Sequence, residues 1–397
     1  MVDDTDDLVV RTPEAFRRAG IDARIRHRVS TVDLRRRAVE VVDLDEGRTY
    51  WEPYDHLLLA TGARPVVPEG IDPGVAGVYT VKSLDDARAI KLALQAAPGA
   101  FVVVVGGGYI GVEMAENLRR TGRSVTVVDR NATLMAHLDP DMSALVTASA
   151  IRLGITLALE EALISLDAPG GVVRGVETDR AHHPAQIVIL GLGVRPDAAL
   201  AASAGVPLGA GGAVHVDEAC RTGVPDVFAA GDCADAYDLV GRRHVYQPLA
   251  THASKQGRVA GLAIAGRPAR FPGVTGTSVT QIGSSDVSRT GLGEREIRAL
   301  GVDAASAAIS STTRVGYMPD SSSITVKLWG ERGSGRLLGG QIVGGAGAGK
   351  RIDVIATALS AAMTVEDLLG LDLAYSPGLS DTWDPVQVAA RVLVRDL

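Results

Sequence analysis

The sequence predicts an α/β protein of two or three domains, and three observations support this. Hydrophobic residues make up 46 % of the 397 residues without any long polar run, so the whole chain is expected to be globular. A chain of this length exceeds one ordinary hydrophobic core. Four consecutive valines at 102–105 run into the glycine-rich segment "GGGYIGVEMAENLRR", which is the strand, turn and helix order of an α/β unit.

The glycine-rich segment has the features of a dinucleotide-binding turn. Gly106, Gly108 and Gly111 allow a tight turn, a close backbone approach to a pyrophosphate, and close packing of helix on strand. A second strand at 124–128 ends in Asp129, 18 residues after Gly111. This is close to the offset of about 20 at which a carboxylate binds the adenosine ribose. A purely structural glycine turn is the alternative.

The acidic strand end also indicates the preferred nucleotide. A carboxylate repels a 2′-phosphate, so Asp129 favours NAD over NADP. Arg123 and Arg130 lie close enough in the sequence to weaken that preference.

The residues before this unit predict short strands and one helix. The last strand, in "YDHLLLATGARP", ends in the small-residue turn Ala60, Thr61, Gly62, which is expected to be a crossing point between domains. A connector rich in Pro and Gly follows at 65–77. The other elements expected here are strands at 38–42 and 49–51 and a helix at 83–95.

The residues after the unit repeat the pattern of an apolar strand followed by small residues. A strand in "AQIVILGLGVRP" is expected to close a domain near Pro196, and one in "VPDVFAAGDCAD" leads to the lone carboxylate Asp232. A helix is expected at 248–265, with first amides that carry partial positive charge. Beyond Phe271 an α+β domain is expected, with strands at 278–282, 323–329 and 337–343 and helices at 351–363 and 365–369.

Composition excludes several classes of protein. A net charge of -7 gives no reason to expect a nucleic-acid partner. The opening MVDDTDD is acidic, unlike a secretory signal, and no apolar run approaches the ~18 residues of a membrane span, so a cytoplasmic protein without a membrane partner is expected. Cys220 and Cys233 fit neither a CxxC pair nor a zinc site. Each is expected to be a small buried residue, and no metal site is predicted.

Several motifs in one order resemble the flavin-dependent pyridine nucleotide-disulfide oxidoreductases. They are "ATGARP", "GGGYIGVEMAE", "GVRPD", "VFAAGDCAD" and "LATHASKQGRVAG". The C-terminal "GYMPDSSSITVKL", "LGLDLAYSP" and "WDPVQVAA" resemble the branch of coenzyme A-disulfide reductase, NADH oxidase and NADH peroxidase. The resemblance implies two Rossmann-like domains, with the FAD domain split by the NAD(P) domain, and a C-terminal α+β dimerisation domain. The expected ranges are 1–78 and 197–270 for FAD, 79–196 for NAD(P) and 271–397 for dimerisation.

The resemblance also implies that an N-terminal segment is missing. Family members open with their own glycine motif for FAD, followed by a redox cysteine, and residues 1–100 contain neither. "DDLVVRTPEAFRRAGIDARIRHRVSTVD" resembles family sequence just after that cysteine. The expectation is that roughly fifty residues are absent, more than the ~30 of one βαβ unit. The FAD site would then be incomplete, and FAD affinity reduced.

The resemblance assigns cofactor contacts to residues in both nucleotide sites. Asp232 would bind the FAD ribityl chain, with a helix cap as the alternative. Tyr109 would cover the flavin until nicotinamide displaces it, with a packed turn residue as the alternative, and Glu113 would contact the nicotinamide end. His252 is expected to be a packed side chain. The complete cofactor-binding set is Val29, Ala60, Thr61, Gly62, Gly106, Gly108, Tyr109, Ile110, Gly111, Glu113, Asp129, Gly193, Gly231, Asp232, Leu249, Ala250 and Thr251.

Two tyrosines carry the expected catalytic role. Tyr317 and Tyr375 match those that, in the coenzyme A-disulfide reductase subgroup, reach across the dimer and could donate hydrogen bonds to a departing coenzyme A thiolate. Interface packing is the alternative. Lys350 and Arg351 would meet coenzyme A phosphates or form a solvated basic pair.

The expected activity is an FAD-dependent oxidoreductase that passes a hydride from NAD(P)H through FAD to coenzyme A disulfide, a persulfide or oxygen. The expected assembly is a homodimer. Because the redox cysteine is absent, the first alternative is a redox-inactive remnant that still binds NAD and dimerises. A ferredoxin-type reductase on the same scaffold is the second, and the C-terminal tyrosine motifs argue against it.

Overall fold

The computed structural model describes residues 8–397 and divides them into two compact units. The first contains the described residues up to Arg64, together with 194–237 and 244–273. The second contains 65–193, 238–243 and 274–397. The acidic residues 1–7, on which part of the expected cytoplasmic location depends, lie outside the described residues. The finer division at 78, 196 and 270 stays a prediction.

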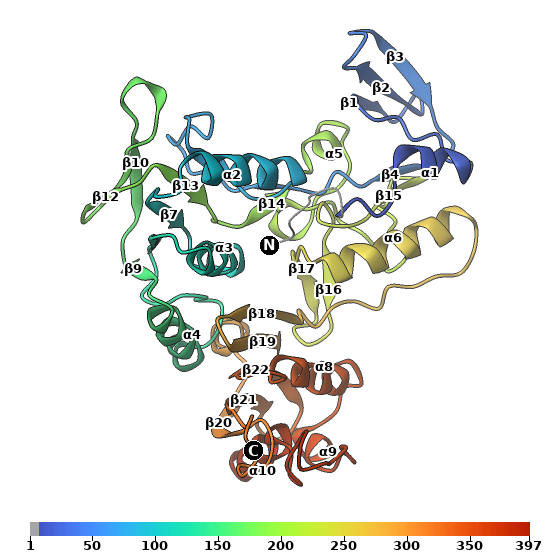
Figure 1. Ribbon diagram of the computed structural model, residues 1–397. Coiled ribbons are helices and arrows are strands. Elements are labelled where there is room, and N and C mark those ends of the chain that lie inside the picture. The colour runs from blue at the N-terminus through green and yellow to red at the C-terminus, as the bar shows by residue number, and fades with distance from the viewer. Residues whose placement is uncertain (1–7) are drawn as a thin grey trace. The chain divides into compact units, whose positions relative to one another are not determined.

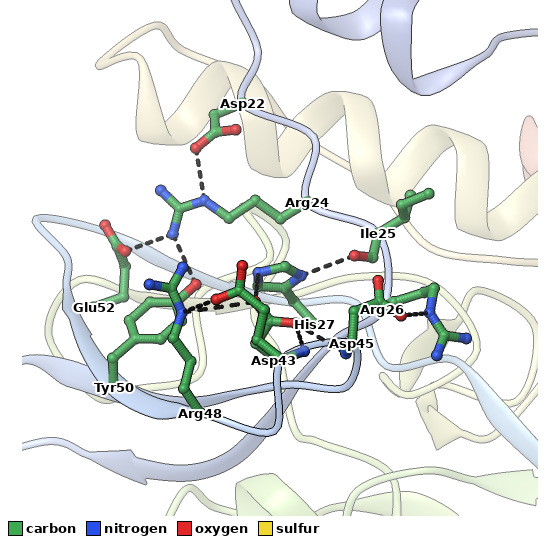
Figure 2. A network of polar contacts seen from close by, with 11 residues as sticks. Asp22, Arg24, Ile25, Arg26, His27, Asp43, Asp45, Arg48, Tyr50 and Glu52 are labelled. Carbon is green, nitrogen blue, oxygen red and sulfur yellow. Dashed lines mark hydrogen bonds and ion pairs between the residues drawn. The ribbon is translucent and has the colours of Figure 1, made fainter.

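The first unit contains an antiparallel sheet of three strands, β1 (His27–Asp33), β2 (Ala38–Asp43) and β3 (Thr49–Pro53). Figure 2 shows a network of polar contacts that joins this sheet to the segment just before it. Arg24 Nη1 donates to Glu52 Oε2 at 2.6 Å, and its Nε donates to Asp22 Oδ2 at 2.6 Å. The buried carboxylate of Asp43 accepts the amides of Asp45 and Glu46, and these bonds hold its pKa below the usual value.

A parallel strand pair lies at the centre of the first unit. Strand β4 (Leu57–Leu59) pairs with β15 (Val227–Ala229), and Leu59, Val227 and Ala229 are buried in its core. The remaining elements of this unit are α1 (Pro13–Arg18), α5 (Ala199–Ser203) and α6 (Ala250–Ile264). Two further short strand pairs belong to this part of the chain: β5 (Ala63–Pro65) pairs with β14 (Val194–Pro196), and β16 (Ala236–Asp238) pairs with β17 (Arg243–Val245).

The second unit contains a parallel sheet of five strands in the order β6-β13-β7-β8-β9. Alternate valines of its central strand face opposite ways, as the period of a strand requires. Val102 and Val104 pack with the helices, and Val103 and Val105 pack with a small antiparallel sheet. The five parallel strands are β6 (Val78–Thr80), β13 (Ile187–Leu190), β7 (Val102–Val105), β8 (Val125–Asp129) and β9 (Thr156–Leu159). The helices are α2 (Leu84–Ala96), α3 (Tyr109–Arg120) and α4 (Pro140–Arg152). The strands of the small antiparallel sheet are β10 (Leu163–Asp167), β11 (Gly175–Thr178) and β12 (His182–Pro184).

The C-terminal part of the second unit is an antiparallel sheet in the order β18-β19-β22-β21-β20, with α8, α9 and α10 gathered around it (Figure 1). Its strands are β18 (Ser278–Ile282), β19 (Ser285–Gly291), β20 (Ala304–Thr312), β21 (Ser323–Glu331) and β22 (Leu337–Gly344). Its helices are α7 (Glu294–Leu300), α8 (Ile352–Ser360), α9 (Val365–Leu369) and α10 (Pro385–Leu393). This arrangement confirms the expected α+β architecture after Phe271.

Most expected elements are confirmed, and one helix end is wrong. The helix expected at 351–363 ends at Ser360, because Ala362 has a positive φ of 53° and Thr364 begins the next helix as its N-cap. The chain before it, 349–351, is a single 3-10 turn. Among residues 8–397, no helix is long and apolar enough to cross a membrane.

Candidate functional site

The glycine turn of the second unit has the geometry that its sequence predicts. Gly106 has a φ of +104°, which only glycine adopts readily. A Cβ placed on Gly111 would lie 1.7 Å from the carbonyl oxygen of Gly106. Gly111 therefore allows the first turn of α3 to pack directly on the end of β7.

The start of α3 fits the pyrophosphate of a dinucleotide. Gly108 is the N-cap and provides no side chain to bond the first amides of the helix. A Cβ on Gly108 would meet nothing within 4 Å. Amides left unbonded at the start of a helix, together with the helix dipole, form an anion site. Ile110, in this first turn, is half-buried.

The acidic residue at the end of β8 lies against the glycine turn. The Asp129 carboxylate accepts the amide of Gly107 and, at 2.7 Å, the amide of Asn131. A carboxylate so placed can receive ribose hydroxyls next to a pyrophosphate on α3. The residues present therefore fit NAD(P).

Arg123 has a structural role that the sequence interpretation missed. Its guanidinium donates to the carbonyl oxygens of Leu94 at 2.7 Å and of Ala97 and Pro98 at 2.9 Å, which closes the end of α2. The interpretation that Arg123 weakens the preference for NAD is therefore not supported. Arg130 is exposed beside Asp129 in the sequence.

Tyr109 and Glu113 lie one helical turn apart on α3, and both bond to β18. The hydroxyl of Tyr109 bonds with that of Ser278, and the Glu113 carboxylate accepts from the Thr280 hydroxyl at 2.7 Å. Burial raises the pKa of Tyr109. In this structure Tyr109 is therefore a packed residue, which was the alternative interpretation. The expected contact of Tyr109 with the flavin stays a prediction.

The aromatic neighbour of Tyr109 is a buried histidine. The ring of His137 lies 4.4 Å from that of Tyr109, measured between centroids. Burial, aided by the charge of Arg289, lowers the pKa of His137 to about 4, so the imidazole is neutral at neutral pH.

Two small-residue turns of the first unit lie at the same edge of a sheet. Strands β4 and β15 are parallel, so the turn Ala60, Thr61, Gly62 and the turn beginning at Ala230 both follow carboxyl ends. Ligands of α/β sheets bind at this edge. The hydroxyl of Thr61 donates to the carbonyl of Asp197, and Gly62 has a φ of +73°.

Helix α6 holds the second of these turns in place. Buried Gln256 accepts the amide of Gly231 at 2.9 Å and donates to the carbonyl of Asp235 at 2.9 Å. Leu249 is the N-cap of α6 and provides no side-chain cap to the amides of the first turn, to which Ala250 and Thr251 belong. The structure thus brings Gly231, Asp232 and the positive start of α6 into one region, which fits the flavin half of FAD. An ADP-binding glycine turn is absent from the described residues of this unit.

The cysteines and His252 are packed, as the sequence predicts. Cys220 and Cys233 are fully buried, and the Sγ of Cys233 lies 3.4 Å from the carbonyl oxygen of Leu59. Burial raises the pKa of Cys220 to about 12. His252 is buried, and its Nδ1 lies 3.1 Å from the carbonyl oxygen of Gln247. Neither thiol can therefore act as an exposed redox nucleophile.

Tyr317 and Tyr375 lie on two loops that one arginine joins. The two tyrosines are 74 % and 50 % exposed. Arg351 donates to the carbonyls of Thr313 at 2.6 Å and Leu379 at 3.3 Å, and to Asp384 Oδ2 at 2.9 Å. Arg351 is therefore a half-buried structural residue rather than part of a solvated pair, while Lys350 is exposed and paired with Asp353.

Two further expected residues, Val29 and Gly193, make backbone contacts with neighbouring segments. Val29 lies on the outer strand β1, where it pairs with Val41 and is 37 % exposed. Gly193 has a φ of +89°, and its carbonyl accepts the amide of Val66 at 2.9 Å. Their roles toward a cofactor stay predictions.

These features together define a class of protein. One unit carries a dinucleotide turn with an acidic strand end, and the other carries two small-residue turns at the carboxyl edge of parallel strands, as in oxidoreductases that use a flavin and a nicotinamide. Residues 6–257 match the family described as pyridine nucleotide-disulphide oxidoreductase, and residues 278–386 match its dimerisation domain. The chain belongs to this family, and the expected fold class is confirmed.

Similar proteins cover nearly the whole chain. It is 37 % identical over 393 residues to a CoA-dependent NAD(P)H sulfur oxidoreductase of Pyrococcus abyssi, a match that spans 98 % of this chain and 86 % of the relative. It is 32 % identical to an NADH oxidase of Methanocaldococcus jannaschii, over 99 % of this chain and 87 % of the relative. The solved structure of an NAD-dependent persulfide reductase from A. fulgidus is 33 % identical, with a TM-score of 0.93, over 98 % of this chain and 71 % of that one.

Proposed function

We propose that the protein is an FAD-dependent NAD(P)H oxidoreductase that reduces a coenzyme A disulfide or persulfide. The observation that carries the proposal is the pairing of the open start of α3 with the Asp129 carboxylate, in a chain whose similar proteins are NAD(P)H oxidoreductases. When bound, the nicotinamide and the flavin supply hydride and electron transfer.

The chain's own residues would bind and orient these cofactors. The amides at the start of α3 receive a pyrophosphate, and Asp129 receives the adenosine ribose. Gly231, Asp232 and the start of α6 lie where a ribityl chain and a flavin ring would be held, with Gln256 fixing the turn. The positive end of α6 favours an anionic ring.

The C-terminal loops support a sulfur-containing compound as the electron acceptor. When two electrons from NAD(P)H cleave the disulfide, the exposed hydroxyls of Tyr317 and Tyr375 would donate a proton or a hydrogen bond to the coenzyme A thiolate that is released. Their loops lie close together, since a Cβ placed on Gly378 would be 3.4 Å from the Cε of Met318. Arg351 ties both loops to one helix start. The names of the P. abyssi and A. fulgidus relatives also support an acceptor that contains sulfur.

Oxygen is the second candidate acceptor. Both thiols of the chain are buried, and reduction of oxygen needs no thiolate from the protein. The NADH oxidase of M. jannaschii supports this candidate. Nothing in the fold or the comparisons favours the redox-inactive alternative.

The proposal also covers the oligomeric state and the cellular location of the protein. We expect a homodimer formed through the C-terminal sheet domain, since residues 278–386 match a dimerisation domain. The cytoplasmic location inferred from the sequence remains part of the proposal.

An acceptor assay with tyrosine variants tests it. Y317F and Y375F should each slow NADH-dependent reduction of coenzyme A disulfide by about 100-fold, the usual scale of one general acid, and leave oxygen consumption unchanged. Y54F, in the first unit, serves as the matched control. Equal rates for all three variants with the disulfide would overturn the assignment, and turnover with oxygen alone would favour the second candidate.

A further inference from the structure

Three side chains with metal-binding atoms converge in the first unit, and the proposed function assigns no role to any of these side chains. His215 Nδ1 lies 2.9 Å from Asp235 Oδ2, and His244 Nδ1 lies 3.2 Å from Asp235 Oδ1. The two imidazole rings are 4.5 Å apart between centroids. One donor atom from each residue falls within 4.8 Å of the others.

The backbone fixes these residues relative to one another. The amide of Val214 donates to the carbonyl of Cys233 at 2.8 Å, and the amide of Asp235 donates to the carbonyl of Val214 at 3.0 Å. His215 and Asp235 therefore lie on adjacent, hydrogen-bonded segments. His244 lies on β17, which pairs with β16 directly after Asp235 (Figure 1).

The carboxylate of Asp235 is buried without a permanent cation. Its side chain is 0 % exposed, and within residues 8–397 its ion pairs are with His215 and His244. The amide of Val216 donates to Oδ1 at 3.1 Å. A buried carboxylate is costly unless a positive charge compensates it, and a bound cation would supply that charge.

The orientation of His244 favours a metal over a hydrogen bond. Its Nδ1 is buried and makes no hydrogen bond, although it lies 3.2 Å from the carboxylate. In a tetrahedral zinc site with ligands at about 2.0–2.1 Å, neighbouring donor atoms lie roughly 3.3 Å apart. The two imidazole nitrogens lie next to different oxygens of Asp235, and one donor atom of each residue lies within 4.8 Å of the others, so the side chains would have to rotate to bring all three donors to an ion.

The ligand set and its exposure identify the class of ion. Two imidazoles and one carboxylate suit zinc and other divalent transition metals rather than calcium or magnesium. The side chains of His215 and His244 are 43 % and 33 % exposed, so an ion can enter and a water can take the fourth position.

We propose that His215, Asp235 and His244 bind a divalent transition metal, with Zn²⁺ as the best match. The ion would tie β17 to the segment around His215 and so stabilise the chain that leads into α6. The sequence predicted no metal site, because 19 and 8 residues separate these three ligands and match no short zinc motif.

Metal titration of the full chain after chelator treatment tests the proposal without any activity assay. Zn²⁺ titrated by calorimetry should bind with one ion per chain, and Co²⁺ should give the visible absorption of a tetrahedral site. H215A and H244A should each weaken Zn²⁺ binding by about 100-fold or more, since even outer-shell changes cost about 10–100-fold. H244Q provides a second variant should H244A fold poorly.

The matched control is H183A. His183 also pairs with a carboxylate, at 2.7 Å from Glu161 Oε2, but belongs to no metal-binding group of three within residues 8–397. H183A should leave the affinity for Zn²⁺ unchanged. No binding to the parent chain, or equal affinity in H215A, H244A and H183A, would overturn the proposal.

Discussion

Gly111 and Asp129 show how single residues set the nucleotide site. A methyl group at Gly111 would overlap the carbonyl of Gly106, so this position fixes how closely α3 approaches β7. Asp129 both holds the turn through Gly107 and presents a carboxylate beside it. The geometry of the nucleotide site therefore depends on the lack of a side chain at Gly111 and on the carboxylate of Asp129.

Removing the Asp129 carboxylate should lower the affinity for NADH. A lost charge-assisted hydrogen bond costs about 1.5–3 kcal/mol, so D129A should raise the Kd for NADH by about 10–100-fold and change that for NADPH much less. Quenching of protein fluorescence measures both constants. D179N is the control, because Asp179 accepts a turn amide, that of Ala162, away from the glycine turn. An unchanged Kd for NADH in D129A would contradict the assignment.

The geometry of single residues could be predicted from the sequence where the interacting residues lie close together in the chain. The three glycines and Asp129 fall within one βαβ unit, so their spacing alone predicts their geometry. The partners of Lys327 and Arg351 could not be predicted in this way. Asp139 and Asp141 lie far from Lys327 in the sequence, and no short pattern connects a loop carbonyl such as that of Thr313 to Arg351.

At the scale of elements, a buried ion pair joins α4 to β21 within the second unit. Lys327 Nζ lies 3.0 Å from Asp139 Oδ2 and 2.9 Å from Asp141 Oδ1. Trp329 donates to the same Asp139 oxygen at 2.7 Å. The network fixes the start of α4 against the C-terminal sheet.

K327M should destabilise this junction by about 3–5 kcal/mol, because it leaves the buried Asp139 carboxylate without its cation. Denaturant unfolding measures the loss. K255M, at an exposed lysine of α6, is the control and should change the free energy of unfolding little. A loss in K327M no larger than that in K255M would show that the network is not stabilising.

The same network predicts a dependence of stability on pH. Burial raises the pKa of Asp139, but hydrogen bonds from the Glu294 amide, Lys327 and Trp329 outweigh it, and the net pKa is lowered. Because the pKa of Asp139 is lower in the folded chain than in the unfolded chain, where it is about 3.9, the ionised carboxylate stabilises the fold at pH values above about 3.9. This stabilisation is lost as the pH falls through the pKa that Asp139 has in the folded chain. Thermal melting should therefore show a steeper loss of stability in acid for the parent chain than for K327M.

Arg351 holds together the loops that carry Tyr317 and Tyr375, as Lys327 holds α4 against the C-terminal sheet. R351K keeps the charge but cannot make bonds to Thr313, Leu379 and Asp384 together, and a loss of about 1.5–3 kcal/mol is expected. Hydrogen exchange should accelerate at 313–322 and 371–384. K350A, an exposed neighbour, should leave exchange there unchanged, and equal exchange in both variants would contradict this role.

Element prediction depended on the strength of the local pattern. Strand β18 and helix α9 match their expected bounds at both ends. The helices α4 and α10 were not anticipated, although each begins with Asp-Pro, and Asp384 caps α10 through the amide of Val386. Their burial against the C-terminal sheet, rather than propensity, defines them.

At the scale of the whole molecule, the proposed dimer would cover large exposed side chains of the C-terminal loops. Tyr317, Tyr375, Leu379 and Trp383 are exposed, and Leu379 is 76 % exposed. Large exposed apolar patches mark interaction sites. L379E should shift the proposed dimer toward monomer in analytical ultracentrifugation. L92E, at a 66 % exposed leucine on α2, should not. A monomeric parent chain would contradict the proposed assembly.

An anaerobic NADH titration followed by visible absorbance tests most directly whether this chain is a flavin-dependent NAD(P)H oxidoreductase. The parent protein, purified and supplied with FAD, should show flavin bands that bleach as NADH is added, and D129A should bleach only at higher NADH concentration. A protein that remains colourless after incubation with FAD, or a bound flavin that NADH leaves oxidised, would contradict this function.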